Sequence, residues 1–380
     1  MKKAFCLFLI LSLSLLSGCY QRREINTLPI VMGFGVDSSE GATEFISQIA
    51  IPSNIVSGGS VSSSNEGKSP YVNIRSDGDY AFPSLRSSAN MLGEKLYMAH
   101  NLLVVFGQDI AEKGINSYMD FFLRDHELRL NMYTLVADGK ASDILSSDSD
   151  FHSIPSIHIT KLVEALDGTA LGVNKNAFDY FSCISSGKRS ALMPLIHIVQ
   201  NGGKDTLQIN GTAVFQNDKM VGTLDTYQTR GYLWAMGNVS NSVITASVYD
   251  TPATVETLHS KGELKVDANG GAVTANVDVI IDASIGSVHG SADFSEPATM
   301  DALCKSISQN VTQEIVAAFE ASKEMDSDFF GIEEALYRSH FSAWKKLKSS
   351  WNNAFKKAQI KVNVDTKILE TGRIQRKTGG

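Results

Sequence analysis

The order of apolar and polar residues predicts a chain built from both strands and helices. Two runs rich in strand-forming residues, 28–36 and 43–51, flank a polar segment that contains Gly41, which is the pattern of a β-hairpin. Residues 53–70 hold seven Ser and three Gly residues, a composition typical of an exposed, flexible loop. Helical and strand-like runs then alternate up to residue 200, which predicts helices packed on a sheet. The helices are expected over 85–96, 110–122, 159–166 and 177–184, and the strands over 102–106, 130–136 and 191–199.

Turn residues predict two β-hairpins in the second half of the chain. Asn217-Asp218 is the predicted turn of the first hairpin, and Asn269-Gly270-Gly271 that of the second. Strict alternation from Val273 to Ile281 indicates that the second hairpin buries one face. Asn201-Gly202-Gly203 predicts a domain boundary. The other expected elements are strands over 207–215 and 220–224 and a short helix over 225–236.

Two apolar stripes with helical spacing mark the C-terminal part. The first predicts a long helix that starts at Pro297. The second predicts another helix, which a strand over 360–368 follows, and both helices are expected to pack on the edge of a sheet. The stripes consist of Met300, Leu303, Ile307, Val311, Ile315 and Ala318, and of Ile332, Leu336, His340, Trp344, Leu347, Trp351 and Phe355.

The first twenty residues have the organisation of a secretory signal. Lys2 and Lys3 precede an apolar stretch that is too short for a transmembrane helix, which needs about 20 apolar residues. The sequence Leu16-Ser17-Gly18-Cys19 resembles the bacterial lipobox, which implies cleavage after Gly18 and acylation of Cys19. We therefore expect a signal peptide over 1–18 and a mature chain that is tethered by lipid at Cys19. An ordinary secretory signal and an uncleaved anchor are the alternatives.

Composition and charge exclude some classes of function. The 380 residues are 43% hydrophobic and 20% charged, which is typical of globular domains. With 34 Lys and Arg residues against 41 Asp and Glu residues, the chain has no global positive field that would hold nucleic acid. The four cysteines show neither zinc nor redox spacing, and whether Cys183 and Cys304 pair is left open.

Known catalytic motifs do not occur in a supporting context. Gly33-Phe34-Gly35 follows a predicted strand, but a second strand comes next instead of the helix that a dinucleotide site requires. The chain contains no nucleophile elbow and no Walker phosphate-binding loop in such a context. We therefore expect no cofactor, no metal and no catalytic residues.

The histidines allow a chemical or a structural interpretation. His340 lies in the second apolar stripe, where it could be a ligand or a pH switch, although a hydrogen-bonded core histidine is favoured. His152 and His158 lie close to Asp148 and Asp150, but their spacing matches no metal-binding motif. A metal site is therefore not expected there.

Two charged segments also have two interpretations. A lysine-rich run beside Trp344 and Trp351 could be a membrane-surface helix, whereas the solvated face of a core helix is favoured. Residues 121–129 mix aromatic and titratable side chains, and they fit a partner surface or a helix end with surface ion pairs equally well. The lysines of the run are Lys345, Lys346, Lys348, Lys356 and Lys357.

A series of motifs resembles one known family. The opening Cys19-Tyr20-Gln21-Arg22-Arg23-Glu24-Ile25 is similar to the mature start of the Ger(x)C family, the GerAC-like C-subunit lipoproteins of spore germinant receptors, although Tyr20 and Gln21 replace the usual Trp and Asp. Further motifs follow in the family's order along essentially the whole mature chain. They are 33–37, Leu96-Tyr97 with His100, 105–107, 120–129 with 137–141, 211–215, 219–225, 229–231, Phe330-Gly331, Trp344, Trp351, Phe355 and 362–372.

The predicted elements define an α+β fold, and the resemblance implies an elongated three-domain body of mixed, largely antiparallel sheets packed with helices. The domains are expected over 19–200, 201–255 and 256–374, with a tail over 375–380. The resemblance also implies a palmitoylated lipoprotein on the outer face of the cytoplasmic membrane, which is the inner membrane of the spore. The implied partners are a polytopic A subunit and a transporter-like B subunit.

The expected function is that of a non-enzymatic, lipid-anchored subunit of a nutrient germinant receptor complex that is required for spore germination. The alternative is a solute-binding lipoprotein that presents a small nutrient to a membrane transporter. Solute binders usually have two α/β lobes around a cleft, whereas the hairpins and the terminal helices predicted for this chain favour the receptor subunit.

The second apolar stripe generates a prediction about stability. Trp344 and Trp351 lie on one face of the stripe, so both side chains should be buried. Replacement of either residue by Ala should lower the free energy of unfolding by about 3–5 kcal/mol, because a large cavity opens in the core. Urea denaturation of the two variants measures this loss, and a change below about 0.5 kcal/mol in both would place the stripe on the surface.

Overall fold

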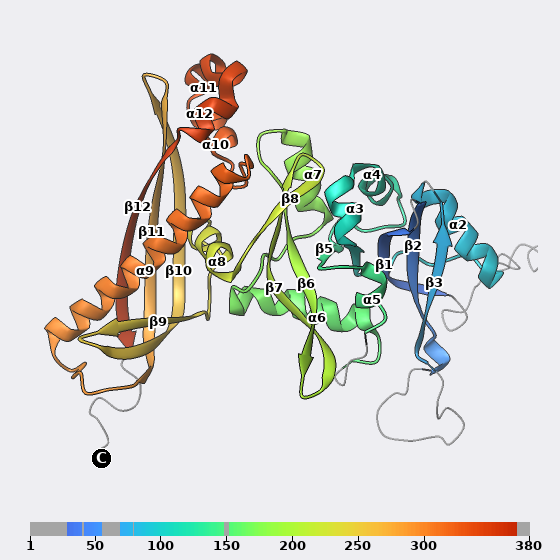
Figure 1. Ribbon diagram of the computed structural model, residues 1–380, viewed down its shortest axis with the longest axis horizontal. Helices are drawn as coiled ribbons and strands as arrows, with labels where there is room; N and C mark the ends of the chain where they lie inside the picture. The colour runs from blue at the N-terminus through green and yellow to red at the C-terminus, as the bar shows by residue number, and fades with distance from the viewer. Residues whose placement is uncertain (1–28, 40–41, 55–68, 79, 148–151, 371–380) are drawn as a thin grey trace, which may run out of the picture.

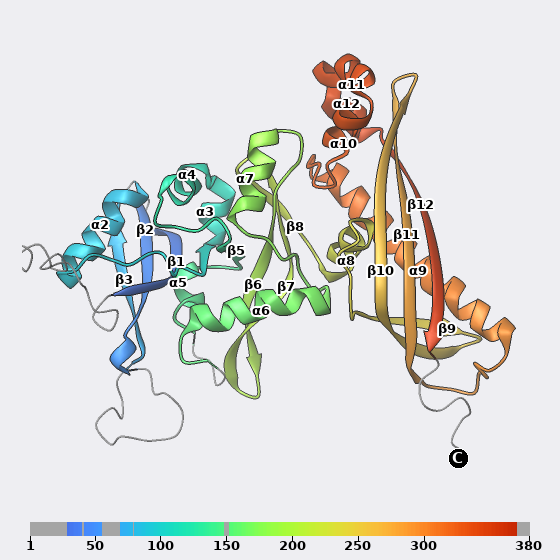
Figure 2. The ribbon, with the colours of Figure 1, turned by 180° about the vertical axis from the view of Figure 1, so that it is seen from behind.

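The computed structural model describes residues 29–39, 42–54, 69–78, 80–147 and 152–370. These residues form an elongated α+β molecule with two mixed sheets, one of eight strands and one of four. Sheet A occupies the N-terminal end and the middle of the molecule, and sheet B occupies the other end, as Figures 1 and 2 show. The expected fold class is therefore confirmed.

Sheet A has the strand order β3-β2-β1-β4-β5-β6-β7-β8. The four strands β1, β4, β5 and β6 run parallel, and the other neighbours are antiparallel. Val104 and Phe106 of β4 pack into one core cluster and Leu103 and Val105 into another, so the centre of the sheet is buried on both faces. The strands are β1 (Ile30–Ser39), β2 (Ala42–Ala50), β3 (Tyr71–Asp77), β4 (Leu103–Phe106), β5 (Tyr133–Ala137), β6 (Leu192–Asn201), β7 (Lys204–Gln216) and β8 (Lys219–Leu224).

Helices cover both faces of sheet A. One face packs against α2 (Ala81–Leu92), α3 (Gln108–Lys113), α4 (Asn116–Arg124) and α7 (Ala177–Ser186), and the other against α5 (Ala141–Ile144) and α6 (Pro155–Thr169). A short 3-10 helix, η2 (Pro52–Asn54), follows β2.

The sequence predicts two hairpins of sheet A correctly and one of its helices wrongly. The β1–β2 and β7–β8 hairpins are confirmed. A single helix over 110–122 is wrong, because Gly114 with φ 124° ends α3 and the Ile115 N–H donates to Asp218 O at 2.9 Å. Most of the expected loop over 53–70 lies outside the described residues.

Sheet B consists of β9 (Val243–Val248), β10 (Thr251–Asn269), β11 (Ala272–Val288) and β12 (Gln359–Glu370), in the order β12-β11-β10-β9. The alternating residues of β11, such as Val277 and Val279, are buried in one core cluster with Leu303 and Ile307 of α9 (Pro297–Glu324). The single buried face is therefore confirmed. The expected position of α9 at a sheet edge is wrong, because this helix contacts both outer strands and so crosses the whole face.

The second apolar stripe does not form one helix. It is divided into α10 (Ile332–Ser339), α11 (Phe341–Leu347), the 3-10 turn η3 (Lys348–Ser350) and α12 (Trp351–Lys356). The backbone of His340, with φ −135° and ψ 58°, ends α10 and redirects the chain. Trp344 and Trp351 still reach the core and are 7% and 8% exposed, which confirms their burial.

Helix α8 (Thr226–Ala235) follows sheet A and packs against α9, which covers sheet B. Arg230 Nε donates to Glu314 Oε2 at 2.8 Å, and Trp234 Nε1 donates to the same oxygen at 2.9 Å. The two helices approach closely because Gly231 has no side chain, and a Cβ atom built there would lie 1.9 Å from Glu314 O. The α8–α9 crossing thus links the helix that follows sheet A to the helix that covers sheet B.

The division into three domains stays a prediction. Strands β6 and β7 pair with each other across the expected boundary at residue 200. The expected boundary at residue 255 falls inside β10.

The helix crossing generates a prediction. Gly231→Ala should lower the free energy of unfolding by about 3 kcal/mol, because the new methyl group forces the backbones of α8 and α9 apart. Gly168→Ala is the matched control, since a Cβ atom in that turn of α6 meets nothing within 4 Å, and it should stabilise the chain by about 0.4–1 kcal/mol. Urea denaturation measures both changes, and equal stability of the two variants would contradict a tight crossing.

Candidate interaction site

The predicted lipid-attachment residue, Cys19, lies outside the described residues, so acylation stays a prediction. Within the described residues, no helix is long and apolar enough to cross a membrane. Cys183 and Cys304 are both free thiols, which closes the question of their pairing.

Three motifs from the sequence meet at the ends of the parallel strands β1, β4 and β5. The carboxylate of Asp37 is buried there and accepts the backbone N–H of Ala141 at 2.7 Å and that of Ser142 at 2.8 Å. A Cβ atom at Gly107 would lie 2.2 Å from Asp37 Oδ1. Ligands often bind at this edge of a parallel sheet, but here the carboxylate fixes the start of α5. Its role is therefore structural.

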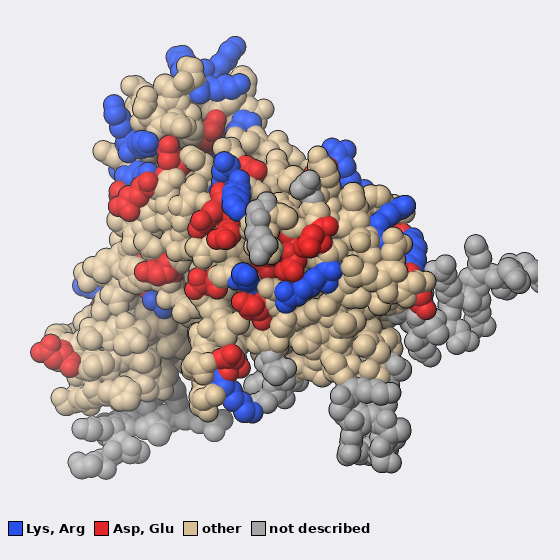
Figure 3. Space-filling view, turned by 45° about the vertical axis from the view of Figure 1, so that its right-hand side comes forward, with Lys and Arg blue, Asp and Glu red and all other residues tan. Residues whose placement is uncertain are grey.

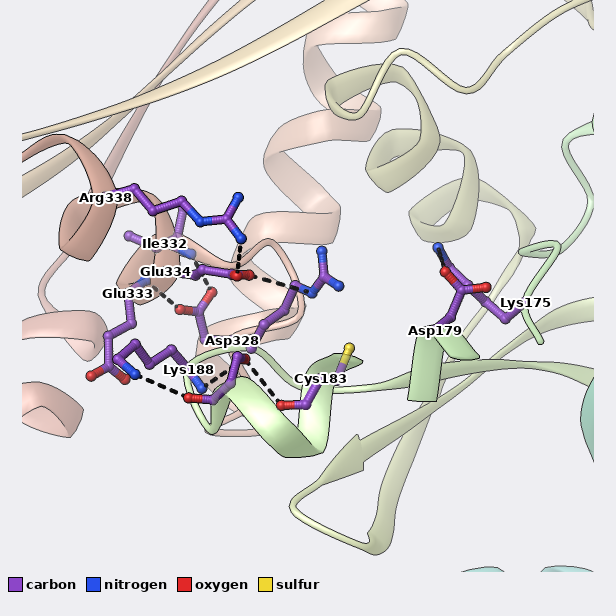
Figure 4. A network of polar contacts seen from close by, with 11 residues as sticks. Lys175, Asp179, Cys183, Lys188, Asp328, Ile332, Glu333, Glu334 and Arg338 are labelled. Atoms are coloured by element: carbon purple, nitrogen blue, oxygen red, sulfur yellow. Dashed lines mark hydrogen bonds and ion pairs between the residues drawn. The ribbon is translucent and has the colours of Figure 1, made fainter. Parts of the chain in front are cut away.

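A second group of polar residues, which the sequence motifs did not include, joins the end of α7 to α10 (Figure 4). The buried carboxylate of Asp328 accepts the N–H groups of Ile332 at 2.9 Å and Glu333 at 2.8 Å. Its backbone carbonyl accepts the N–H of Ser190 at 2.9 Å. Burial raises the pKa of the Asp328 carboxyl to about 7, although these N–H donors oppose the change. Asp328 thus attaches the start of α10 to the segment that follows α7.

Charged and aromatic side chains extend this contact to the surface. Lys188 Nζ lies 4.7 Å from the ring centre of Tyr337 and 5.7 Å from that of Trp344. Lys348 Nζ lies 5.3 Å from the Trp344 ring, and Trp344 Nε1 donates to Glu333 Oε1 at 2.9 Å. Cation–π contacts of this kind stabilise an exposed site by about 0.5–1 kcal/mol each.

The expectation of a core histidine at position 340 is wrong. The His340 side chain is 49% exposed, and its Nε2 lies 3.4 Å from Asp267 Oδ1. The break between α10 and α11 turns His340 away from the core that Leu336 and Trp344 enter.

Of the remaining candidates, His152 lies in the loop before α6, and His158 is buried within α6. His152 and His158 lie 5.9 Å apart between ring centres, and burial lowers the pKa of His158. No group of three potential metal ligands occurs among the described residues. In the segment 121–129, α4 ends at Arg124, which pairs with Asp120 at 2.8 Å. The interpretation as a helix end with surface ion pairs therefore fits this segment.

A cleft of about 400 Å³ lies between the end of α6 and the segment after α8. Asp167 and Lys175 line it and carry opposite charges. The Asp167 carboxylate accepts the Asn174 amide at 3.2 Å, and Lys175 Nζ lies 3.9 Å from Asp179 Oδ1. Both charges already have protein partners, so a bound solute would compete with these contacts.

The fold and the site define the class of the protein. It is an α+β protein with two mixed sheets joined by a helix crossing, and its buried carboxylates hold elements of the fold together. The model for "Spore germination protein N-terminal domain" matches residues 21–198, and the model for "Spore germination B3/ GerAC like, C-terminal" matches residues 210–372. The chain belongs to this GerAC-like family of spore germination proteins.

Curated relatives and a solved structure resemble the chain over most of its length. "Spore germination protein KC" of Bacillus subtilis (strain 168) is 25% identical over 98% of this chain and 96% of its own. "Spore germination protein B3" of the same organism is 20% identical over 94% and 95% of the two chains. The crystal structure of the GerBC protein matches 91% of this chain and all of its own at 17% identity, with a TM-score of 0.59. This last match shows a shared fold.

Asp328 generates a prediction about pH. An unfolded Asp titrates near pH 3.9, whereas burial raises the pKa of Asp328 in the folded chain to about 7. Between these values the folded chain holds a proton that the unfolded chain releases, so the contribution of Asp328 to stability is lost as the pH rises through this window. The slope should reach about 1.4 kcal/mol per pH unit.

Urea denaturation of the wild type and of Asp328→Asn from pH 5 to pH 8 measures this effect. Because other groups titrate in both proteins, the difference between the two slopes isolates Asp328. Identical slopes would contradict a proton on the folded carboxyl.

Proposed function

We propose that the chain is a non-enzymatic, lipid-anchored subunit of a nutrient germinant receptor. The observation that carries the proposal is the match to "Spore germination protein KC" along 98% of this chain. The buried carboxylates of Asp37, Glu314 and Asp328 support the non-enzymatic part, because each accepts hydrogen bonds from protein donors that hold two elements together.

The proposed anchor is a lipid on Cys19 at the outer face of the cytoplasmic membrane, which is the inner membrane of the spore. Nine residues lie between Cys19 and Pro29, the first described residue, and the ten steps of chain from Cys19 to Pro29 span at most about 35 Å. The tether therefore keeps sheet A close to the membrane. Weak contacts with a polytopic A subunit and a transporter-like B subunit then suffice, because tethering raises their effective concentration.

The cleft beside Asp167 is the place where a second candidate function would act, that of a lipoprotein that captures a small polar solute for a transporter. Crosslinking from the folded body in intact spores separates the two. Capture of polytopic receptor subunits supports the first function, whereas capture of an ABC permease supports the second.

The anchor generates a prediction. Cys19→Ala should abolish the incorporation of a labelled fatty acid and strongly reduce germination through this receptor, because the acyl acceptor is gone. Cys304→Ala is the matched control, since it removes a partly buried thiol of α9 and should leave the label in place. Normal labelling of Cys19→Ala would refute the lipid anchor.

A further inference from the structure

Positive charge gathers at one end of an otherwise acidic molecule. Residues 335–364 contain seven Lys and Arg residues and no Asp or Glu, although the whole chain has 34 basic and 41 acidic residues. Figure 3 shows Lys and Arg side chains at the top of the molecule, over α10–α12, whereas both signs mix over the rest of that face. This separation of basic from acidic residues is not required for folding, because apolar side chains make the core contacts of these helices. They are Leu336, Trp344, Trp351 and Phe355.

Most of these charges lack a compensating carboxylate. Arg338 pairs with Glu334, and Lys356 lies 3.4 Å from Asp326. Lys345, Lys346 and Lys357 are exposed, and none of them forms an ion pair with a residue that the structure describes. The end of the molecule thus presents an uncompensated positive surface.

Apolar rings stand among the lysines. Phe341 is 52% exposed and Tyr337 is 39% exposed, and their ring centres lie 5.6 Å apart. An aromatic ring buried in the lipid headgroup region and lysines that meet its phosphates are the two features of an interfacial membrane contact. A purely acidic protein partner would meet the lysines but would leave Phe341 unexplained.

We infer that this end, the basic cap, contacts the anionic headgroups of the membrane that holds the chain. The inference rests on the proposed lipid anchor, because the anchor brings the cap within reach of a bilayer. The basic cap consists of Tyr337, Phe341, Lys345, Lys346, Lys348 and Lys357.

Quenching by brominated lipids tests the contact. The lipidated full chain is incorporated into vesicles of phosphatidylcholine alone or of equal parts phosphatidylcholine and phosphatidylglycerol. Phe341→Trp places a fluorophore in the basic cap, and Tyr249→Trp places one in the exposed β9–β10 turn, which lies on the opposite long side of the molecule in Figure 1. The wild type, which has its own Trp344 and Trp351 on these helices, sets the baseline. Above this baseline, bromine should quench Phe341→Trp on the anionic vesicles only, and Tyr249→Trp on neither.

Charge reversal tests the electrostatic part in the Phe341→Trp background. Removal of each lysine from an anionic surface weakens binding by about fivefold, so Lys345→Glu with Lys346→Glu should abolish the quenching. The matched pair Lys161→Glu and Lys204→Glu lies on α6 and at the start of β7 and should have no effect. Salt at about 1 M should release the wild-type cap, because it shortens the screening length to about 3 Å.

The outcomes separate the cap from the anchor. Phe341→Trp without quenching on anionic vesicles, or with equal quenching on neutral ones, overturns the inference. Dissociation of the chain from neutral vesicles would contradict the proposed lipid anchor. Salt-sensitive quenching on anionic vesicles would in that case still support the contact between the basic cap and the headgroups.

Discussion

The buried ion pair between Arg230 and Glu314 sets the arrangement of the two sheets. Glu314 is 2% exposed, and its carboxylate also accepts the Trp234 N–H at 2.9 Å. Hydrogen bonding to Glu314 raises the pKa of Arg230, so the guanidinium stays charged. Loss of one partner from such a site costs about 3–5 kcal/mol, because the other charge stays buried without compensation. This contact holds α9 against α8, and the contacts of Asp328 hold the start of α10 to the segment after α7.

The motifs behind the family resemblance have structural roles. Asp37 and Gly107 fix the start of α5, and Asp225 begins α8 by accepting the Gln228 N–H at 2.8 Å. In the motif 229–231, the Thr229 hydroxyl donates a hydrogen bond to that of Thr212, and Arg230 forms an ion pair with Glu314. Gly231 allows the close approach of α9, because it has no side chain. These residues hold elements of the fold together, so the exposed side chains are the ones available for contacts with other molecules.

Local patterns were sufficient to predict the elements whose cause is local. The hairpin at Asn269-Gly270-Gly271 and the helix from Pro297 follow from turn chemistry and apolar spacing. The break at His340 could not be predicted, since the stripe keeps its spacing across it. Glu314 was also missed, because a single Glu in an exposed-looking position gives no sign of a partner 84 residues away. The lysine run was visible in the sequence, but only the structure shows that the lysines and Phe341 are exposed at one end.

A tether and a charged cap at two distant points of the molecule would act together on orientation. The described chain enters sheet A at one end of the long axis, and α10–α12 project from one long side of the molecule beside sheet B (Figures 1 and 2). A lipid tether alone lets the body rotate freely, whereas a second contact at the basic cap turns the long side that carries α10–α12 toward the bilayer. Each contact raises the effective concentration of the other, so the pair holds more tightly than either does alone. The side that carries α6 and the β6–β7 turn then faces away from the lipid.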